Sequence, residues 1–224
     1  MKRSEINRLI TESIEFFKEH HFNLPPWAFW KPEDWKGKYD ACHEIIDNIL
    51  GWDLTDFGSG DFHKEGLILF TIRNGNQQKD KKSYAEKIMI VEENQLTPMH
   101  FHWSKMGDII NRGGGNLVIN LCRSDKDENF SNENVIVKID GITRTIPTGG
   151  SVTLAPGESI CLVQGLFHSF YGEAGKGKVL VGEVSDTNDD SIDNKFYVPV
   201  GRFPEIIEDE APLHLLASDY KNYI

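Results

Sequence analysis

The sequence lacks any apolar run of the length that a membrane-spanning helix needs, about 20 residues. Its first residues, MKRSEINRLITESIEFF, carry charges throughout and do not resemble a signal peptide. We therefore expect a cytoplasmic protein with no membrane segment.

Basic residues are also scarce, since 24 Lys and Arg stand against 35 Asp and Glu and give a formal net charge of −11 at pH 7. No basic stripe is interleaved with aromatic residues. A field of this sign repels polyanions, so we expect no nucleic acid partner, and a neutral or cationic ligand is favoured.

Cysteine is rare as well. The three cysteines, Cys42, Cys122 and Cys161, are odd in number, widely spaced and set among apolar or strand-like neighbours. This pattern argues against a disulfide framework and predicts buried, unreactive thiols.

The organisation of the chain predicts a single domain over residues 1–224, with a helical arm (1–65), a β-barrel (66–200) and a C-terminal segment (201–224). Apolar residues at helical spacing follow Ser4, a possible cap, and predict an amphipathic helix that ends near His20. The stretch LPPWAFWKPEDW cannot continue a helix and is expected to lie as an ordered arm. A second short helix is expected over residues 40–50.

From about residue 66 onward, short apolar runs alternate with turn residues, and Asp140-Gly141 is a hairpin signal. The runs are GLILFTIRN, YAEKIMIVE, NLVINLC, VIVKID, SVTL, SICLV and KVLVGEV. This spacing predicts a β-sandwich or barrel.

The segment TPMHFHWSKMGDIINRGGGNL carries the most specific signal. On a strand, His100 and His102 would place both imidazoles on one face, where they could share a metal ion. Taken alone, such a pair is more often two polar histidines on a strand with no cation between them.

A two-part pattern strengthens the metal interpretation, because it resembles that of the cupin family. His100 and His102 are followed at the family's spacing by Gly107 and Gly114, and Gly107 stands where the family has Glu. The second part places His168 in register, with Val163 in place of the usual Pro. The resemblance implies a mainly β protein, a cupin jelly-roll barrel with short N-terminal helices and an arm, whose metal ligands are His100, His102 and His168.

Longer segments are similar to the D-lyxose isomerase family of cupins, namely PPWAFW, HFHWSKMGDIINRGGGNL, GEVSDTNDDSIDNKF, GRFPEIIEDEAP and LLASDY. This resemblance covers nearly the whole chain. It implies a divalent ion, typically Mn²⁺, and interconversion of D-lyxose with D-xylulose and often of D-mannose with D-fructose.

Gly107 departs from the family pattern, because glycine offers no side-chain ligand. Asp108 would point to the opposite face of a strand unless a bulge intervened. Water completing the coordination shell, weak metal binding or an altered activity are the other interpretations. Three imidazoles without a carboxylate also favour zinc or nickel over manganese.

Aldose–ketose isomerisation through an enediolate needs a base at C2, an electrophile and a proton route between the two oxygens. Glu183 is the predicted base, because its apolar neighbours in KVLVGEVS would bury it and raise its pKa. An outward carboxylate on an edge strand is the alternative. Lys105 is predicted to bond a substrate hydroxyl or to shuttle a proton, and a solvated turn lysine is its alternative.

Four further residues are predicted to contact the sugar. Asp193 and Arg202 are candidates for hydroxyl binding, although charged loop residues are commonly just solvated. Trp27 and Phe29 could stack on a sugar face or pack as a lid. The glycines at 113–115 are expected to permit a tight backbone path beside the site.

Three other functions remain open at this point. A non-haem iron dioxygenase also uses cupin histidines. A sugar-phosphate isomerase would need several converging Arg or Lys, which the motifs do not offer. A catalytically weakened, sugar-binding cupin is the third, because of Gly107. A homodimer is expected, since β-sandwiches often cover strand edges by pairing.

Overall fold

The structure is a computed structural model that describes residues 1–76, 79, 81–201 and 204–224. Its helical elements are α1 (Arg3–Glu19), η1 (Pro26–Phe29), η2 (Pro32–Trp35), α2 (Tyr39–Asp47), η3 (Ala217–Asp219) and α3 (Tyr220–Tyr223). None of the helices in these ranges has the length and apolar character to cross a membrane.

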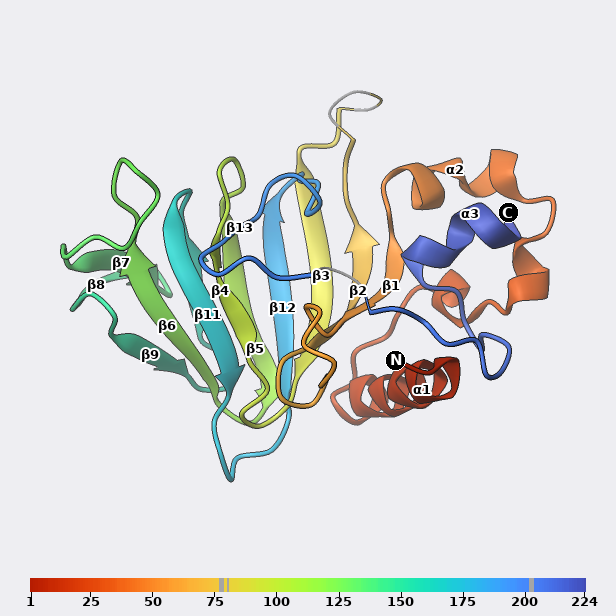
Figure 1. Cartoon of the computed structure of the whole chain (residues 1–224), viewed down its shortest axis with the longest axis horizontal. Helices are drawn as coiled ribbons and strands as arrows, with labels where there is room; N and C mark the ends of the chain where they lie inside the picture. Colours follow the sequence, from red (N-terminus) through yellow and green to blue (C-terminus); the bar gives the residue numbers. More distant parts are fainter. Residues whose placement is uncertain (77–78, 80, 202–203) are drawn as a thin grey trace.

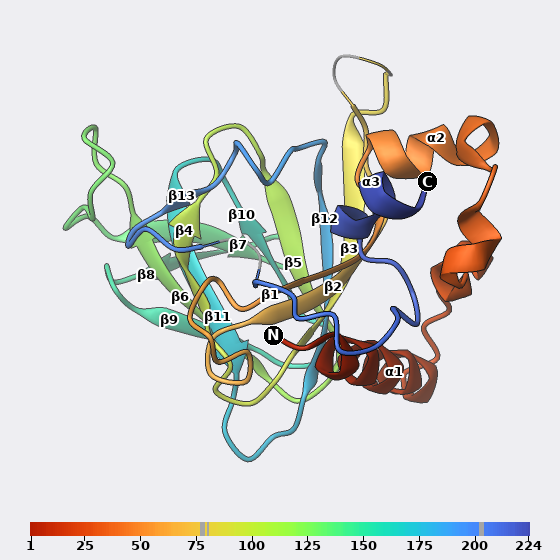
Figure 2. The ribbon, with the colours of Figure 1, turned by 45° about the vertical axis from the view of Figure 1, so that its right-hand side comes forward.

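The strands form two antiparallel sheets that pack face to face (Figures 1 and 2). The strands are β1 (Gly51–Thr55), β2 (Leu67–Arg73), β3 (Tyr84–Val91), β4 (Thr97–Phe101), β5 (Gly107–Gly114), β6 (Leu117–Arg123), β7 (Val135–Ile139), β8 (Ile142–Ile146), β9 (Ser151–Leu154), β10 (Ser159–Leu162), β11 (Leu166–Gly172), β12 (Val179–Asp186) and β13 (Lys195–Phe196). One sheet runs β1-β2-β3-β12-β5-β10-β7-β8 and the other β13-β4-β11-β6-β9. The predicted mainly β architecture is confirmed.

The main core lies between the two sheets, because alternate side chains of each strand turn inward. In β7, Val135, Val137 and Ile139 are buried while the residues between them are exposed. Asp140 and Gly141 both have positive φ values and close the β7–β8 hairpin, as the sequence predicts.

The N-terminal arm covers the outer face of the larger sheet at its β1 end (Figure 1). The apolar stripe of α1 packs there against Trp52, Phe70 and Leu180. The helix begins at Arg3, so Ser4 does not cap it and bonds to Asp209 instead.

The predicted segment boundaries stay a prediction. β1 falls within the predicted arm, yet it pairs along its length with β2 and so forms the edge of the larger sheet. The second helix, α2, overlaps the predicted range 40–50, but it begins one residue earlier, at Tyr39, and ends at Asp47.

The three cysteines are free. Cys42 and Cys122 are buried and Cys161 is partly buried. Burial raises the pKa of the Cys42 and Cys161 thiols, which disfavours the reactive thiolate form.

The glycine run at 113–115 does provide a tight backbone path, but against α1 rather than beside the metal histidines. A Cβ at Gly113 would lie 2.7 Å from the His20 ring. At Gly114, where φ is +83°, it would lie 2.2 Å from the Lys178 carbonyl oxygen. The run therefore lets β5 pass closely beneath the end of α1.

A buried arginine joins the two ends of the chain. The Arg3 guanidinium donates to both carboxylate oxygens of Asp219, at 3.0 and 2.9 Å, and to Glu208 at 2.9 and 2.7 Å. Only 1% of its side chain is exposed. These charges hold α1 against the C-terminal segment.

We predict that Asp219→Ala lowers the free energy of unfolding by about 3–5 kcal/mol, because it leaves the buried Arg3 charge without this partner. Glu15→Ala, which removes an exposed pair with Lys18 on the same helix, should cost less than about 1 kcal/mol. Urea unfolding of both variants measures the difference. Equal losses would show that the Arg3 contacts do not join the chain ends.

Candidate active site

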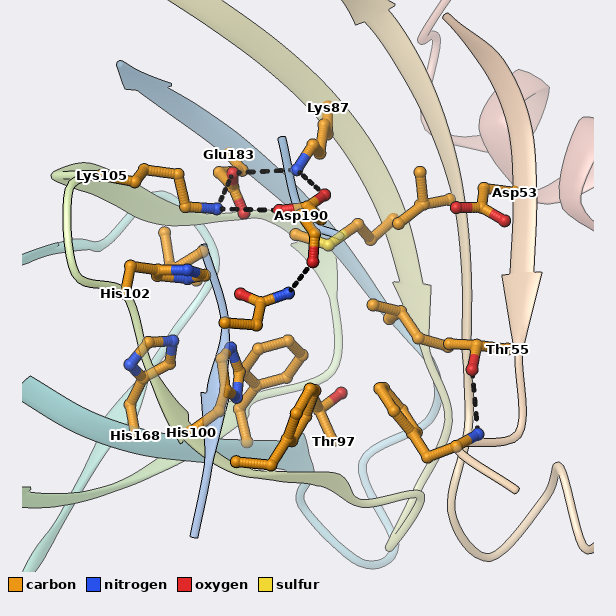
Figure 3. A pocket seen from close by; sticks show the side chains of 18 of the residues that line it. Asp53, Thr55, Lys87, Thr97, His100, His102, Lys105, His168, Glu183 and Asp190 are labelled. Atoms are coloured by element: carbon orange, nitrogen blue, oxygen red, sulfur yellow. Dashed lines mark hydrogen bonds and ion pairs between the residues drawn. The ribbon is translucent and has the colours of Figure 1, made fainter. Parts of the chain in front are cut away.

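Three histidines from the smaller sheet meet inside the sandwich (Figure 3). His100 lies on β4, His102 directly follows it, and His168 lies on β11 opposite His100 in the strand register. Each offers one ring nitrogen, and these atoms lie within 4.8 Å of one another. The structure thus brings together the three predicted metal ligands.

Backbone carbonyls fix the orientation of all three rings. The Nδ1 atoms of His100, His102 and His168 lie 2.7, 3.0 and 2.9 Å from the carbonyl oxygens of Pro98, Asp193 and Leu166. A carbonyl can only accept, so each Nδ1 carries the hydrogen and each Nε2 keeps a lone pair. Lone pairs gathered in this way suit a cation.

The histidines are also held neutral. Burial is the main cause that lowers the pKa of His100 and of His102 to about 3; the neighbouring His102 adds to it for His100, and the Lys105 charge for His102. Burial likewise places the pKa of His168 well below its usual value. A metal ligand must be deprotonated, so the rings fit a divalent ion without a proton being displaced.

Beside the histidines lies a network of two lysines and two carboxylates (Figure 3). Lys105 Nζ lies 2.8 Å and Lys87 Nζ 3.5 Å from the same oxygen of Glu183. Lys87 also lies 2.6 Å from Asp190, and Lys105 lies 3.8 Å from it. The predicted pair Glu183 and Lys105 is thus in direct contact.

Glu183 is buried, as the sequence predicts, but its pKa moves in the opposite direction to the one expected. Burial disfavours its charge, yet the positive charges of Lys105 and Lys87 outweigh that effect and hold the pKa of Glu183 well below its usual range. The sequence interpretation overlooked Lys87. Glu183 is therefore ionised at neutral pH.

Both groups line one cavity of about 300 Å³ between the sheets. Its histidine end and its lysine–carboxylate network face each other, and apolar side chains form much of the remaining wall. The apolar residues are Phe57, Leu67, Leu69, Met89, Ile109, Leu162, Phe170, Phe196 and Val200. A cavity of this size and character suits one small molecule.

The chain matches a known protein family over nearly its whole length. A family model described as D-lyxose isomerase matches residues 1–220. The chain belongs to the D-lyxose isomerase family. Two curated relatives, the D-lyxose/D-mannose isomerases of Escherichia coli O157:H7 and Serratia proteamaculans, are each 47% identical to it over 100% of both chains. The predicted family is confirmed.

Solved structures support the fold. An L-ribose isomerase from Cellulomonas parahominis with L-ribose has a TM-score of 0.62 at 15% identity, over 92% of this chain and 98% of that one. The L-ribose isomerase of Geodermatophilus obscurus has a TM-score of 0.60 at 14% identity, over 88% of this chain and 93% of that one. At these identities the likeness shows a shared fold.

Gly107 lines the cavity where the cupin pattern has a glutamate ligand. It lies opposite Ser185 of β12, and a Cβ at position 107 would lie 2.7 Å from the Ser185 Cβ. Asp108 is exposed on the other face of β5, opposite Cys161 of β10 in the strand register. Its carboxylate therefore does not substitute for the family ligand.

The described residues predicted to contact the sugar, Asp193, Trp27 and Phe29, do not line this cavity. Asp193 is buried beside His102, and its carboxylate oxygens accept hydrogen bonds from backbone amides. Trp27 and Phe29 lie in η1 and do not line the cavity; the Trp27 ring packs 4.9 Å from that of Phe70. Arg202 lies outside the described residues.

Sequence reasoning missed Lys87 and Asp190. Lys87 carried a usable signal, because it is a charged residue inside the apolar run YAEKIMIVE, on the same strand face as Met89. Asp190 sits in a polar segment with three other aspartates, so nothing in the local pattern distinguishes it. Whether Asp190 or a neighbouring aspartate reaches the cavity depends on how the loop folds.

We predict that Gly107→Glu alone destabilises the protein by about 1–3 kcal/mol, because the new Cβ forces β12 away. Adding Ser185→Gly moves the glycine to the partner strand and should restore the melting temperature. The double variant should then bind Mn²⁺ roughly tenfold more tightly than the unaltered chain, because a carboxylate joins the imidazoles.

The control is Ser185→Gly by itself, which removes the opposing Cβ without supplying a ligand. Thermal unfolding and titration of Mn²⁺ followed by electron paramagnetic resonance give the two quantities. A stable Gly107→Glu protein, or a double variant with unchanged affinity, would contradict the account.

Proposed function

We propose that the chain is a metal-dependent isomerase that interconverts D-lyxose with D-xylulose and D-mannose with D-fructose. The observation that carries the proposal is the meeting of three neutral, converging imidazoles with a buried, ionised Glu183 in one cavity. The names of the two relatives, D-lyxose/D-mannose isomerase, support the choice of sugars.

Glu183 is the proposed base that moves the proton between C2 and C1. Its contacts with Lys105, Lys87 and Ser185 fall on one oxygen, Oε1, and we propose that the other oxygen takes the proton. A carboxylate held by two lysines is a weak base, so the C2 proton must be acidified for transfer to occur. Lys105, 2.8 Å from Glu183, can hydrogen-bond the sugar oxygen as charge develops there.

A divalent ion held by His100, His102 and His168 would polarise the sugar oxygens at C1 and C2 and so acidify that proton. We propose Mn²⁺ as this ion, on the family resemblance. Because imidazole sites bind nickel and zinc more tightly than manganese, the ion is tested by metal analysis of protein purified without added metal.

The charge of the cavity favours a free sugar over a sugar phosphate. Lys87 and Lys105 are the lysines among the described lining residues, and both are held in ion pairs with carboxylates. A phosphate would need cations that are free to bind it. The family to which the chain belongs does not favour the dioxygenase or the sugar-binding cupin.

The test is incubation of metal-stripped protein, with and without Mn²⁺, with D-lyxose or D-mannose in deuterated water. We expect ketose formation only with the ion, solvent deuterium in the product and no oxygen consumption. Glu183→Gln should lower kcat by about 100-fold or more without changing metal content. Glu133→Gln, at an exposed pair with Arg123, is the matched control.

Absence of turnover with any of these sugars in the Mn²⁺ form would refute the proposal. Oxygen uptake would favour the iron dioxygenase. Equal kcat in the Glu183→Gln and Glu133→Gln proteins would remove Glu183 from the mechanism.

We also propose a homodimer. β8 forms an edge of the larger sheet, and the hairpin that it shares with β7 exposes Ile136 and Ile142, at 68% and 61%. Light scattering should therefore give about twice the chain mass of 25.5 kDa, and a monomer mass at micromolar concentration would contradict it.

A cytoplasmic location is proposed from the free, unpaired cysteines, which suit a reducing compartment. Cell fractionation tests it, and recovery from the periplasm would contradict it.

A further inference from the structure

The segment at residues 187–194, between β12 and β13, packs against the turn that follows the His100–His102 strand. Within it, Asp193 is only 7% exposed. One of its carboxylate oxygens accepts the Ser104 amide at 2.8 Å and the other accepts the Lys105 amide at 3.0 Å. Both oxygens therefore bind backbone.

The same residue also holds a metal-site imidazole. The backbone carbonyl of Asp193 accepts the hydrogen on His102 Nδ1 at 3.0 Å. Asp193 thus contacts His102 through its main chain and Lys105 through its side chain. These two residues belong to the two halves of the site, the histidine cluster and the lysine–carboxylate network.

The turn is held from the opposite side as well, but through carbonyl groups. Gln164 donates to the Ser104 carbonyl at 2.9 Å and the Gly165 amide donates to the His102 carbonyl at 2.9 Å. Neither contact holds the His102 ring or the Lys105 amide. Among the described residues, the hydrogen bonds to the His102 ring and to the Lys105 amide come from Asp193.

We propose that Asp193 is a positioning residue that fixes the His102 ring and the Lys105 backbone relative to each other, and so sets both metal affinity and the Lys105–Glu183 contact. A carboxylate bound by two successive amides locks the turn, and the locked turn keeps the Asp193 carbonyl on His102. The part that concerns Lys105 rests on the proposed function; the part that concerns metal affinity does not.

The variant to make is Asp193→Asn, which keeps the shape but places an amide NH₂ against one of the two backbone N–H groups. Asp189→Asn is the matched control, because Asp189 lies in the same segment and its exposed carboxylate accepts the Ser191 amide at 2.8 Å, away from the histidines. Asp193→Ser, which keeps one acceptor in a smaller side chain, is the second variant.

The primary measurement is the Kd for Mn²⁺ without sugar, and the second is the melting temperature of the metal-free protein. We expect Asp193→Asn to weaken Mn²⁺ binding by roughly 10–100-fold, with Asp193→Ser weakened likewise and Asp189→Asn unchanged. The metal-free melting temperature of Asp193→Asn should stay close to that of Asp189→Asn. At saturating Mn²⁺, the kcat of Asp193→Asn should still lie below that of the unaltered protein.

An unchanged Kd in Asp193→Asn overturns the proposal, and so does a lower metal-free melting temperature with unchanged Kd, which would make Asp193 a purely structural residue. Failure of both Asp193 variants to fold would likewise make Asp193 a structural residue and overturn the proposal. If the unaltered chain isomerises no sugar while Asp193→Asn still loses Mn²⁺ affinity, the proposed function fails and the positioning role stands.

Discussion

Three hydrogen bonds from imidazole Nδ1 atoms to backbone carbonyls determine what this cavity can do. The carbonyls of Pro98, Asp193 and Leu166 select the tautomer of each ring and leave three Nε2 lone pairs close together. Two of these carbonyls belong to the same strands as their histidines, so local strand geometry supplies the orientation. The third comes from the segment before β13, which makes the site depend on long-range packing.

The charged network beside the histidines follows from the same packing. β3 and β12 pair so that Lys87 and Glu183 are register partners, and the segment after β12 brings Asp190 to both lysines. Two lysines balance two carboxylates, so this network can lie buried without an uncompensated charge. The cost is a weaker base, because a carboxylate stabilised in this way accepts a proton less readily. Gly107 brings no further negative charge into the cavity, and the close approach of Ser185 leaves no room there for another carboxylate.

Much of this arrangement could be predicted from local sequence patterns. The period-two spacing of His100 and His102, the apolar runs and the Asp140-Gly141 turn depend on neighbouring residues, and the structure bears them out. The direction of the Glu183 pKa could not be predicted, because it depends on the positive charges of Lys105 and Lys87, both distant in sequence, and strand pairing is what brings Lys87 to Glu183. The contacts of Asp193 with residues 102–105 could not be predicted for the same reason, because the two segments meet only in the folded chain.

The central claim is that the protein presents three neutral imidazoles with their Nε2 lone pairs free for one cation. Long-range ¹H–¹⁵N correlation spectra of the metal-free protein at pH 7, with ¹⁵N-labelled histidine, test it directly. We expect His100, His102 and His168 to show the Nδ1–H tautomer, and all three Nε2 resonances to shift together on addition of one equivalent of a diamagnetic divalent ion such as Zn²⁺. A protonated ring, an Nε2–H tautomer at any of the three, or shifts confined to one histidine would contradict the account.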